Sequence, residues 1–127
     1  MPYVNTWEPG GVYRKFNGLV SSKDFVTSIK SVLGDHRFDT LKYVVIDYLD
    51  ASEFEFTLFD RMLVRALRIG AFHTNSRIKI AIVTSSETIR QSVQESIDKN
   101  ETMFQTAVFS SIKEANVWSG RPDATNP

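Results

Sequence analysis

The sequence of 127 residues contains no cysteine. This absence excludes disulfide frameworks, thiolate metal sites and cysteine nucleophiles. There are two histidines, His36 and His73, and they are isolated from each other, so a zinc site is not expected either. We expect the protein to use no cofactor.

The charge balance and the short apolar runs limit the classes of partner. Fifteen basic and fifteen acidic side chains give a net charge of zero, which argues against an extended nucleic-acid surface. No uncharged apolar run approaches the roughly 20 residues of a membrane span, and the first residues lack the features of a signal peptide. We therefore expect a soluble, cytoplasmic protein without a membrane span and without a nucleic-acid partner.

The motifs of common enzymes are also missing. The glycine doublet at Gly10 and Gly11 fits a tight turn and not a phosphate-binding loop. Ser85, Ser86 and Ser110 follow expected strands, where a nucleophile could lie, but none has the glycines of a G-x-S-x-G turn. We expect a protein that is not an enzyme, with an uncharacterised hydrolase as the alternative.

The length and the composition predict one domain. With 42% hydrophobic residues, the chain can bury a single continuous core. We assign residues 1–120 to this domain. Residues 121–127 have no apolar anchor, so we expect a flexible C-terminal tail there.

Residues 3–7 and 12–16 alternate between apolar and polar side chains, which predicts a β-hairpin around the turn "EPGG". Asn17 and Gly18 are expected to end its second strand. Three further strands are predicted at residues 41–47, 78–84 and 105–109. The first two of these are apolar on both faces, which is typical of central parallel strands covered by helices.

Four helices are expected, at residues 21–34, 56–75, 86–100 and 111–120. Ser21 and Ser111, each followed by an acid three residues later, resemble helix-starting capping boxes, and Gly34 and Gly120 are C-terminal stops. The second helix has an apolar arc wider than half its circumference, so deep packing is expected. The order of the elements predicts an α/β fold, with a mostly parallel sheet between helices and one antiparallel strand.

In open α/β sheets, ligands bind beyond the carboxyl ends of the parallel strands, where loops and helix N-termini converge. This edge is predicted to contain residues 47–57 and 84–87. The candidate residues for binding a partner or a ligand are Asp47, Asp50, Ser52, Glu53, Glu55, Thr57, Thr84, Ser85 and Ser86.

Asp47 lies at the end of a predicted buried strand. It could receive a phosphoryl group or bind a cation, like the acceptor aspartate of response-regulator receiver domains. The acidic pair and the lysine that accompany that aspartate are missing here. The favoured interpretation is that Asp47 accepts hydrogen bonds from nearby N–H groups and fixes its loop.

Acids alternate with aromatic residues in "DASEFEF" at residues 50–56. This stretch could be a docking loop, because interface anchors are often aromatic residues flanked by charge. It could equally be a strand extension in which Phe54 and Phe56 enter the core while Glu53 and Glu55 stay solvated. The sequence leaves both interpretations open.

Arg61, Arg65 and Arg68 fall within one narrow arc of the long helix, and Phe72 follows a turn later. This arc could be a stripe that binds an anion or a partner. The favoured interpretation is an ordinary solvated face with one exposed aromatic residue.

Four segments together resemble the SpoIIAA-like STAS family, a group of small bacterial STAS and Sec14-related domains. They are "FNGLVSSKDF", "GDHRFDTLKYVVIDYLDA", "RIKIAIVTSSETI" and "TAVFSSIKEANVW". The resemblance implies a mixed sheet of about five strands with helices on both faces and a role in binding or regulation without catalysis. In STAS domains of the anti-anti-sigma type, a regulatory serine lies in an Asp-Ser-x-Gly motif after the strand that corresponds to residues 43–47. Here the region reads "EFEFTLFD", so the motif is absent.

Two binding functions follow from the resemblance. The first is a cytoplasmic, non-enzymatic STAS-like module that binds a protein partner through residues 47–57 and 84–87, with a homodimer contact on the long helix. The second is a carrier or sensor of a small apolar or lipid-like ligand, bound between the long helix and the sheet. The side chains expected to line that cavity are Phe59, Met62, Leu63 and Ala66. A third function, an enzyme using Asp47 as acid or base, lacks a second catalytic group.

Overall fold

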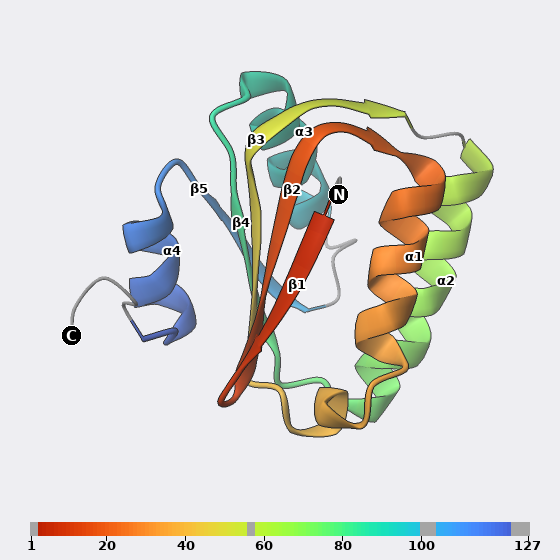
Figure 1. Ribbon diagram of the computed structural model, residues 1–127, viewed down its shortest axis with the longest axis vertical. Helices are drawn as coiled ribbons and strands as arrows, with labels where there is room; N and C mark the ends of the chain where they lie inside the picture. Colours follow the sequence, from red (N-terminus) through yellow and green to blue (C-terminus); the bar gives the residue numbers. More distant parts are fainter. Residues whose placement is uncertain (1–2, 56–57, 100–103, 123–127) are drawn as a thin grey trace.

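The computed structural model describes residues 3–55, 58–99 and 104–122, without the side chains of residues 58–64. In this part of the chain, five strands form one sheet in the order β1-β2-β3-β4-β5 (Figure 1). The first pair of strands is antiparallel and the others are parallel, which confirms the predicted mixed sheet. The strands are β1 (Tyr3–Glu8), β2 (Gly11–Ser21), β3 (Tyr43–Glu55), β4 (Lys79–Val83) and β5 (Gln105–Phe109). The helices are α1 (Ser22–Leu33), η1 (a 3-10 helix, His36–Thr40), α2 (Leu58–Thr74), α3 (Glu87–Asp98) and α4 (Ile112–Ser119).

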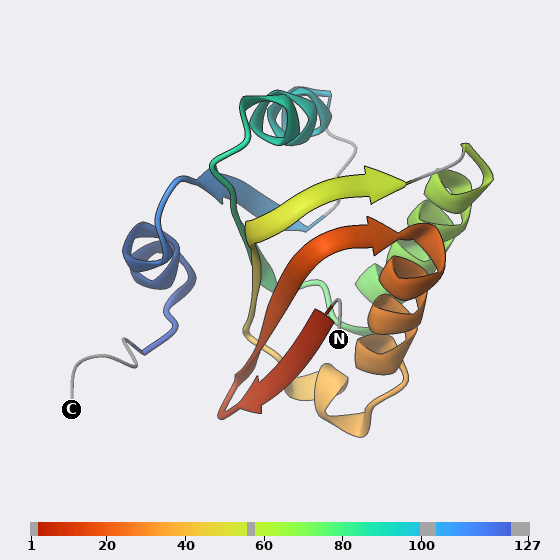
Figure 2. The same cartoon turned by 45° about the horizontal axis from the view of Figure 1, so that its top comes forward.

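Helices cover both faces of the sheet. Alternate residues of β3 point to opposite faces. Val44 and Ile46 join the core beneath α1, α2 and α3, whereas Tyr43 and Val45 pack with Ala115 of α4. Figure 2 shows α4 on one side of the strands, and α1 with α2 on the other. The first half of β3 is therefore buried on both faces, as its apolar run predicted.

The predicted helix ends are present. The Ser21 side chain accepts a hydrogen bond from the Asp24 N–H at 3.1 Å at the start of α1, and Ser111 accepts one from the Glu114 N–H at 3.2 Å at the start of α4. Gly120 ends α4 with a φ of 84°, in the left-handed region that favours glycine. The capping boxes in the sequence therefore locate these helices correctly.

β2 and β3 continue beyond their predicted ends. β2 runs through Asn17 and Gly18, and its parallel pairing with β3 continues to Ser21 opposite Glu55. Two register shifts along this stretch place two extra residues in β3 relative to β2. The prediction that β2 stops at Asn17 and Gly18 and that a loop follows Asp47 is wrong, because the bulges let pairing continue. Figure 2 shows the two strands arching over toward α1 and α2.

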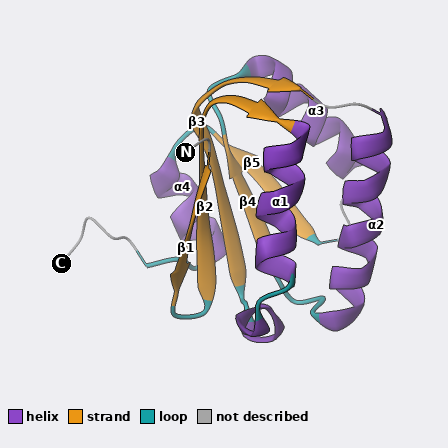
Figure 3. Ribbon diagram, turned by 45° about the vertical axis from the view of Figure 1, so that its right-hand side comes forward, coloured by secondary structure: helices purple, strands orange, loops and turns teal. Residues whose placement is uncertain are grey.

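α2 lies beside α1 and packs chiefly against it (Figure 3). Among its described side chains, Ala71 is buried and Leu67 is half-buried, while Ala66, Ile69 and Gly70 are exposed. The prediction of deep packing over more than half of the helix is therefore wrong for the described side chains of α2. The reason is that α2 sits at the outside of the helical layer, so only its inward side is covered.

On the face of the sheet that α4 covers, a cluster of hydrogen bonds connects Arg121 to the β1–β2 hairpin. Glu8 accepts two hydrogen bonds from the guanidinium of Arg121, each 2.9 Å, and one from the Tyr43 hydroxyl at 2.6 Å. The Tyr43 ring covers Gly11 so closely that a Cβ at this position would overlap it. Arg121 thus packs against the folded domain, and the domain division at residue 120 stays a prediction. Residues 123–127 of the predicted tail lie outside the described residues.

Replacing Glu8 tests this cluster through its pH dependence. The hydrogen bonds from Arg121 hold the pKa of Glu8 below its usual value of 4.5, against the opposing effect of burial. A carboxyl group with a lowered pKa stabilises the fold above its usual pKa, and the contribution is lost as the pH falls through the folded value. We expect Glu8→Gln to lower the free energy of unfolding by about 1–2 kcal/mol at pH 7, because water partly screens the pair. Urea unfolding from pH 7 to pH 3 should show this difference shrinking below about pH 4.5.

The matched control is Glu95→Gln on α3. Glu95 pairs with Lys99 at 2.7 Å, but both side chains are exposed. An exposed pair of this kind contributes little, so this variant should unfold almost like the wild type at every pH. A Glu8 variant that behaves like the control would show that the cluster does not stabilise the fold.

Candidate functional site

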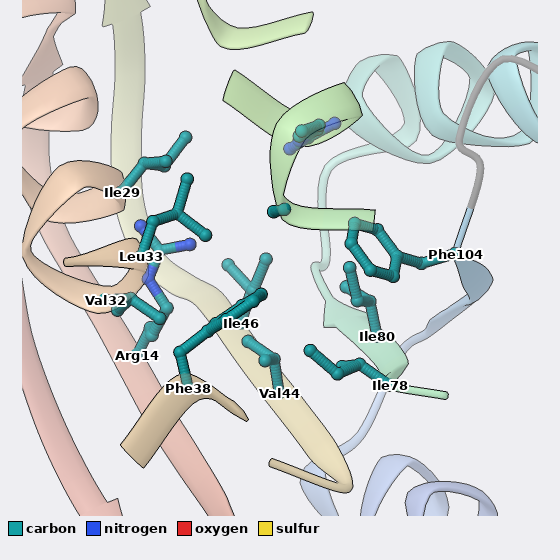
Figure 4. Close-up of a pocket in the computed structure, with 12 residues that line it drawn as sticks. Arg14, Ile29, Val32, Leu33, Phe38, Val44, Ile46, Ile78, Ile80 and Phe104 are labelled. Atoms are coloured by element: carbon teal, nitrogen blue, oxygen red, sulfur yellow. The ribbon is translucent and has the colours of Figure 1, made fainter. Parts of the chain in front are cut away.

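A cavity of about 50 Å³ lies between α1, α2 and the sheet (Figure 4). Its lining is almost entirely aliphatic and aromatic, apart from two arginines. Figure 4 shows Arg14 among the side chains of α1 and Phe104 on the opposite side of the cavity. The lining residues are Arg14, Ile29, Val32, Leu33, Phe38, Val44, Ile46, Arg68, Ala71, Ile78, Ile80 and Phe104.

Arg14 occupies an inward position of β2, between the fully buried Val12 and Phe16, and is only 4% exposed. Its Nη2 donates to the Ser28 hydroxyl at 2.5 Å, and its Nε donates to the Asn5 side-chain oxygen at 3.3 Å. The guanidinium carbon lies 5.3 Å from the centre of the Phe16 ring. These contacts fix the guanidinium plane at the edge of the cavity.

The third nitrogen of the Arg14 guanidinium, Nη1, has no hydrogen-bond acceptor among the described residues. No described carboxylate pairs with Arg14 either. Burial without a counter-charge disfavours the charged form and lowers the pKa of Arg14 to about 10. The cavity wall therefore carries a positive charge that no described carboxylate balances.

Arg68 of α2 is the second arginine that lines the cavity. Its side chain is half-buried, burial lowers its pKa, and no described acid pairs with it. The charges of Arg68 and Arg14 also repel, which contributes to the lowered pKa of Arg14. The cavity thus combines apolar walls with an excess of positive charge.

The predicted arginine stripe on the long helix divides between solvent and the interior. Arg65 is exposed, whereas Arg68 lines the cavity and Phe72 packs edge-on against Phe104 with ring centres 5.4 Å apart. An ordinary solvated face is therefore the wrong interpretation for Arg68 and Phe72. The side chain of Arg61 lies outside the described residues.

A buried asparagine closes the cavity at the end of α2. Asn75 is 4% exposed, and its Nδ2 donates to the backbone carbonyls of Phe38 at 2.9 Å and Leu41 at 3.0 Å. These bonds hold η1, with Phe38 in the cavity wall, against the end of α2. Asn75 was not predicted from the sequence, because nothing local distinguishes it from a helix-ending residue.

The cavity lies where the carrier hypothesis placed it, between the long helix and the sheet, but its described lining differs from the predicted one. Ala66 is exposed and does not contribute, while Arg68 and Ala71 do. The other predicted side chains, Phe59, Met62 and Leu63, lie outside the described residues.

Asp47 lies on the opposite face of the sheet, 3% exposed. Its carboxylate accepts hydrogen bonds from the Tyr13 hydroxyl and from the Leu49 N–H, the latter at 2.9 Å. Burial, and then the bond to Asp47, raise the pKa of Tyr13. Asp47 therefore fixes the backbone after it, which agrees with the interpretation that the sequence favoured.

The acidic segment after Asp47 belongs to β3. Phe54 packs edge-on against Tyr48, with ring centres 4.9 Å apart, so the strand-extension interpretation is correct for the described residues. The outward side chains along this half of the strand are Asp50, Ser52, Glu53 and Glu55, all exposed. Asp50 also pairs with Lys15 at 3.0 Å. Phe56 and Thr57 lie outside the described residues.

The predicted residues after β4 serve the start of α3. Thr84 is buried and accepts a hydrogen bond from the Ser86 N–H at 3.0 Å, and Ser86 accepts one from the Ile89 N–H at 3.3 Å. Ser85 is exposed. For the eight predicted residues that are described, no hydrogen bond or ion pair joins the group after β4 to the exposed acids of β3.

The fold is SpoIIAA-like. A solved structure of an uncharacterized protein of the DUF3478 family from Shewanella loihica PV-4, with a SpoIIAA-like fold, is similar to this chain. The TM-score is 0.59, and the similarity covers 91% of this chain and 90% of that chain. The sequence identity is 12%, so the similarity concerns the fold alone. No protein-family model and no curated protein match the chain.

No helix in the described part of the chain has the length and the apolar character to span a membrane. In the same residues, no group of three or more histidine, aspartate or glutamate side chains is arranged to hold a metal ion.

Replacing Arg14 by methionine tests whether the buried charge stabilises the fold. Methionine is unbranched like the arginine stem, though shorter than the whole side chain, and contacts aromatic rings favourably, while the uncompensated charge disappears. We expect Arg14→Met to leave the free energy of unfolding unchanged or to raise it by up to about 2 kcal/mol. Urea unfolding at pH 7 measures the difference.

Arg37→Met is the matched control. Arg37 lies over the Trp7 ring at 4.1 Å and has an acidic partner, Asp35, at 2.8 Å. Removing this paired cation should lower the stability slightly. A clear loss of stability in Arg14→Met would instead make Arg14 a structural residue.

Proposed function

We propose that the protein is a non-enzymatic binding module that holds a small, mainly apolar ligand in the cavity between α1, α2 and the sheet. The observation that carries this proposal is the cavity itself, which lies among side chains of the hydrophobic core. Protein interiors are close-packed, and cavities larger than a water molecule are few and reduce stability. A binding function explains why this one is kept.

The chemistry of the lining supports binding without turnover. General acid–base catalysis needs a group that titrates near the working pH, and covalent catalysis needs a nucleophile. The described lining offers neither, because its polar members are Arg14 and Arg68. Guanidinium groups position ligands and seldom exchange protons.

The size of the cavity sets the size of the ligand. A single water needs about 10–15 Å³ on this measure, and an engineered apolar cavity of about 150 Å³ binds benzene. The 50 Å³ found here suits a group of a few heavy atoms. A longer ligand would require α2 to move outward from α1.

Filling the cavity from α2 tests the proposal. Ala71 is buried and lines the cavity. Ala71→Leu should place three more carbons in that space and abolish binding, whereas Ala66→Leu, on the exposed side of the same helix, should not. Native mass spectrometry of freshly purified protein is the measurement, with the denatured chain as reference. We expect extra mass on the wild type and on Ala66→Leu, and none on Ala71→Leu. Two results together would refute the proposal. The native mass of the wild type would equal that of the bare chain, and butan-1-ol would raise the thermal stability of the wild type no more than that of Ala71→Leu.

A protein partner is the second candidate, supported by the outer half of β3. Beyond Asp47, this strand pairs with β2 alone among the described strands, so no described strand lies along its other edge. An unpaired edge can accept a strand from a partner. The exposed acids Asp50, Glu53 and Glu55 would favour a basic segment. The homodimer contact proposed for the long helix stays a prediction.

The triple variant Asp50→Ala, Glu53→Ala and Glu55→Ala tests this second candidate. We expect basic proteins that the immobilised wild type captures from source-cell lysate at low salt to be lost, because the attraction is electrostatic. Quantitative mass spectrometry of the captured proteins is the measurement.

The control removes three exposed acids of α3 instead, through Glu87→Ala, Glu95→Ala and Asp98→Ala. It changes the net charge equally and should leave capture intact. Equal capture by the wild type and both variants would rule out the β3 surface.

A further inference from the structure

We propose that the ligand of the cavity carries a carboxylate group that pairs with Arg14 and Arg68; this inference rests on the binding function proposed above. Two arginines that come from different elements, Arg14 of β2 and Arg68 of α2, line the cavity. An anion in this space would face both.

The charge balance of the site is the first argument. A buried charge without a counter-ion is costly, and proteins normally pair it with an acid of their own. Here the described residues supply no acid for either arginine, although the sequence as a whole is balanced at fifteen basic and fifteen acidic residues. A bound anion would offset the cost.

The hydrogen bonding of Arg14 is the second argument. Asn5 and Ser28 hold Nε and Nη2, while Phe16 and Phe25 lie 5.3 and 5.9 Å from the guanidinium carbon. The group is therefore fixed in place before any ligand arrives, and its Nη1 remains available. A donor that is already oriented loses little entropy when an acceptor binds.

The number of donors favours a carboxylate over a phosphate. A carboxylate has two oxygens, which an arginine fork and a second guanidinium can satisfy. A phosphate presents more oxygens and a larger charge, and the rest of the described lining has no side-chain donor to offer, because it consists of aliphatic and aromatic side chains. The same walls suit a short hydrocarbon chain. The expected ligand class is a short aliphatic or aromatic carboxylic acid.

Four probes of similar size separate charge from shape: butyrate, butan-1-ol, butylammonium and inorganic phosphate. Methyl NMR signals of Ile29, Ile46 and Ile78, which line the cavity, report where each probe binds. For the wild type we expect butyrate to bind roughly tenfold or more tightly than butan-1-ol, since hydrogen bonds to charged groups are the stronger ones. Butylammonium and phosphate should not shift these signals. Across longer carboxylates, affinity should rise about fourfold per methylene until the cavity is full.

Arg68→Gln is the test variant, and Arg65→Gln, one turn earlier and exposed, is its control. Arg68→Gln should lower butyrate affinity by roughly tenfold and leave butan-1-ol affinity unchanged. Arg65→Gln should bind both probes like the wild type. Arg14→Met, which we expect to fold, repeats the test from the other side of the cavity.

The outcomes distinguish a failure of the carboxylate inference from a failure of the proposed apolar binding function. Equal binding of butyrate and butan-1-ol would refute the carboxylate while leaving the apolar binding function intact. Displacement of butyrate by phosphate at similar concentration would refute the choice of carboxylate over phosphate. If no probe shifts the cavity signals, both the inference and the binding function fail.

Discussion

The two extra residues of β3 are the constraint on which the rest of the structure depends. A parallel pair with equal numbers of residues would continue the regular twist of the sheet. The longer strand instead arches with β2 toward the helices (Figure 2). α2 then packs beside α1 instead of directly on the strands (Figure 3). The space that remains above the strands, between these helices, is the cavity, so its position follows from the register shifts.

The cavity combines two features that each oppose stability, an unfilled volume and a charge without a described partner. Natural proteins keep such features where function requires them, and compensate elsewhere. Compensation is visible on the other face of the sheet, where Arg121 lies in a fully paired cluster with Glu8 and Tyr43. The two arginines thus differ in whether a described acid balances their charge. Arg121 pairs with an acid of the chain, Glu8, whereas no described acid pairs with Arg14.

The sequence predicts well what depends on neighbouring residues. The order of the elements along the chain, the hairpin and the serine-capped helix starts follow from periodicity and turn chemistry, and the structure confirms them. The end of β3 was misplaced because the bulges break its alternation after Asp47. The contact between Arg121 and Glu8 joins residues 113 positions apart, which no local pattern can reveal. Arg14 could have been found, because a charged residue between Val12 and Phe16 occupies an inward position of an alternating strand.

The one-sided pairing of β3 has a consequence for the solubility of the protein at high concentration. An unpaired strand edge is a template on which copies of a chain can aggregate. Two copies meeting along this edge would bring their exposed acids, Asp50, Glu53 and Glu55, close together. Their mutual repulsion acts over roughly 10 Å at 0.1 M salt. The acids that made this segment resemble a loop in the sequence therefore also protect the folded protein against edge-to-edge aggregation.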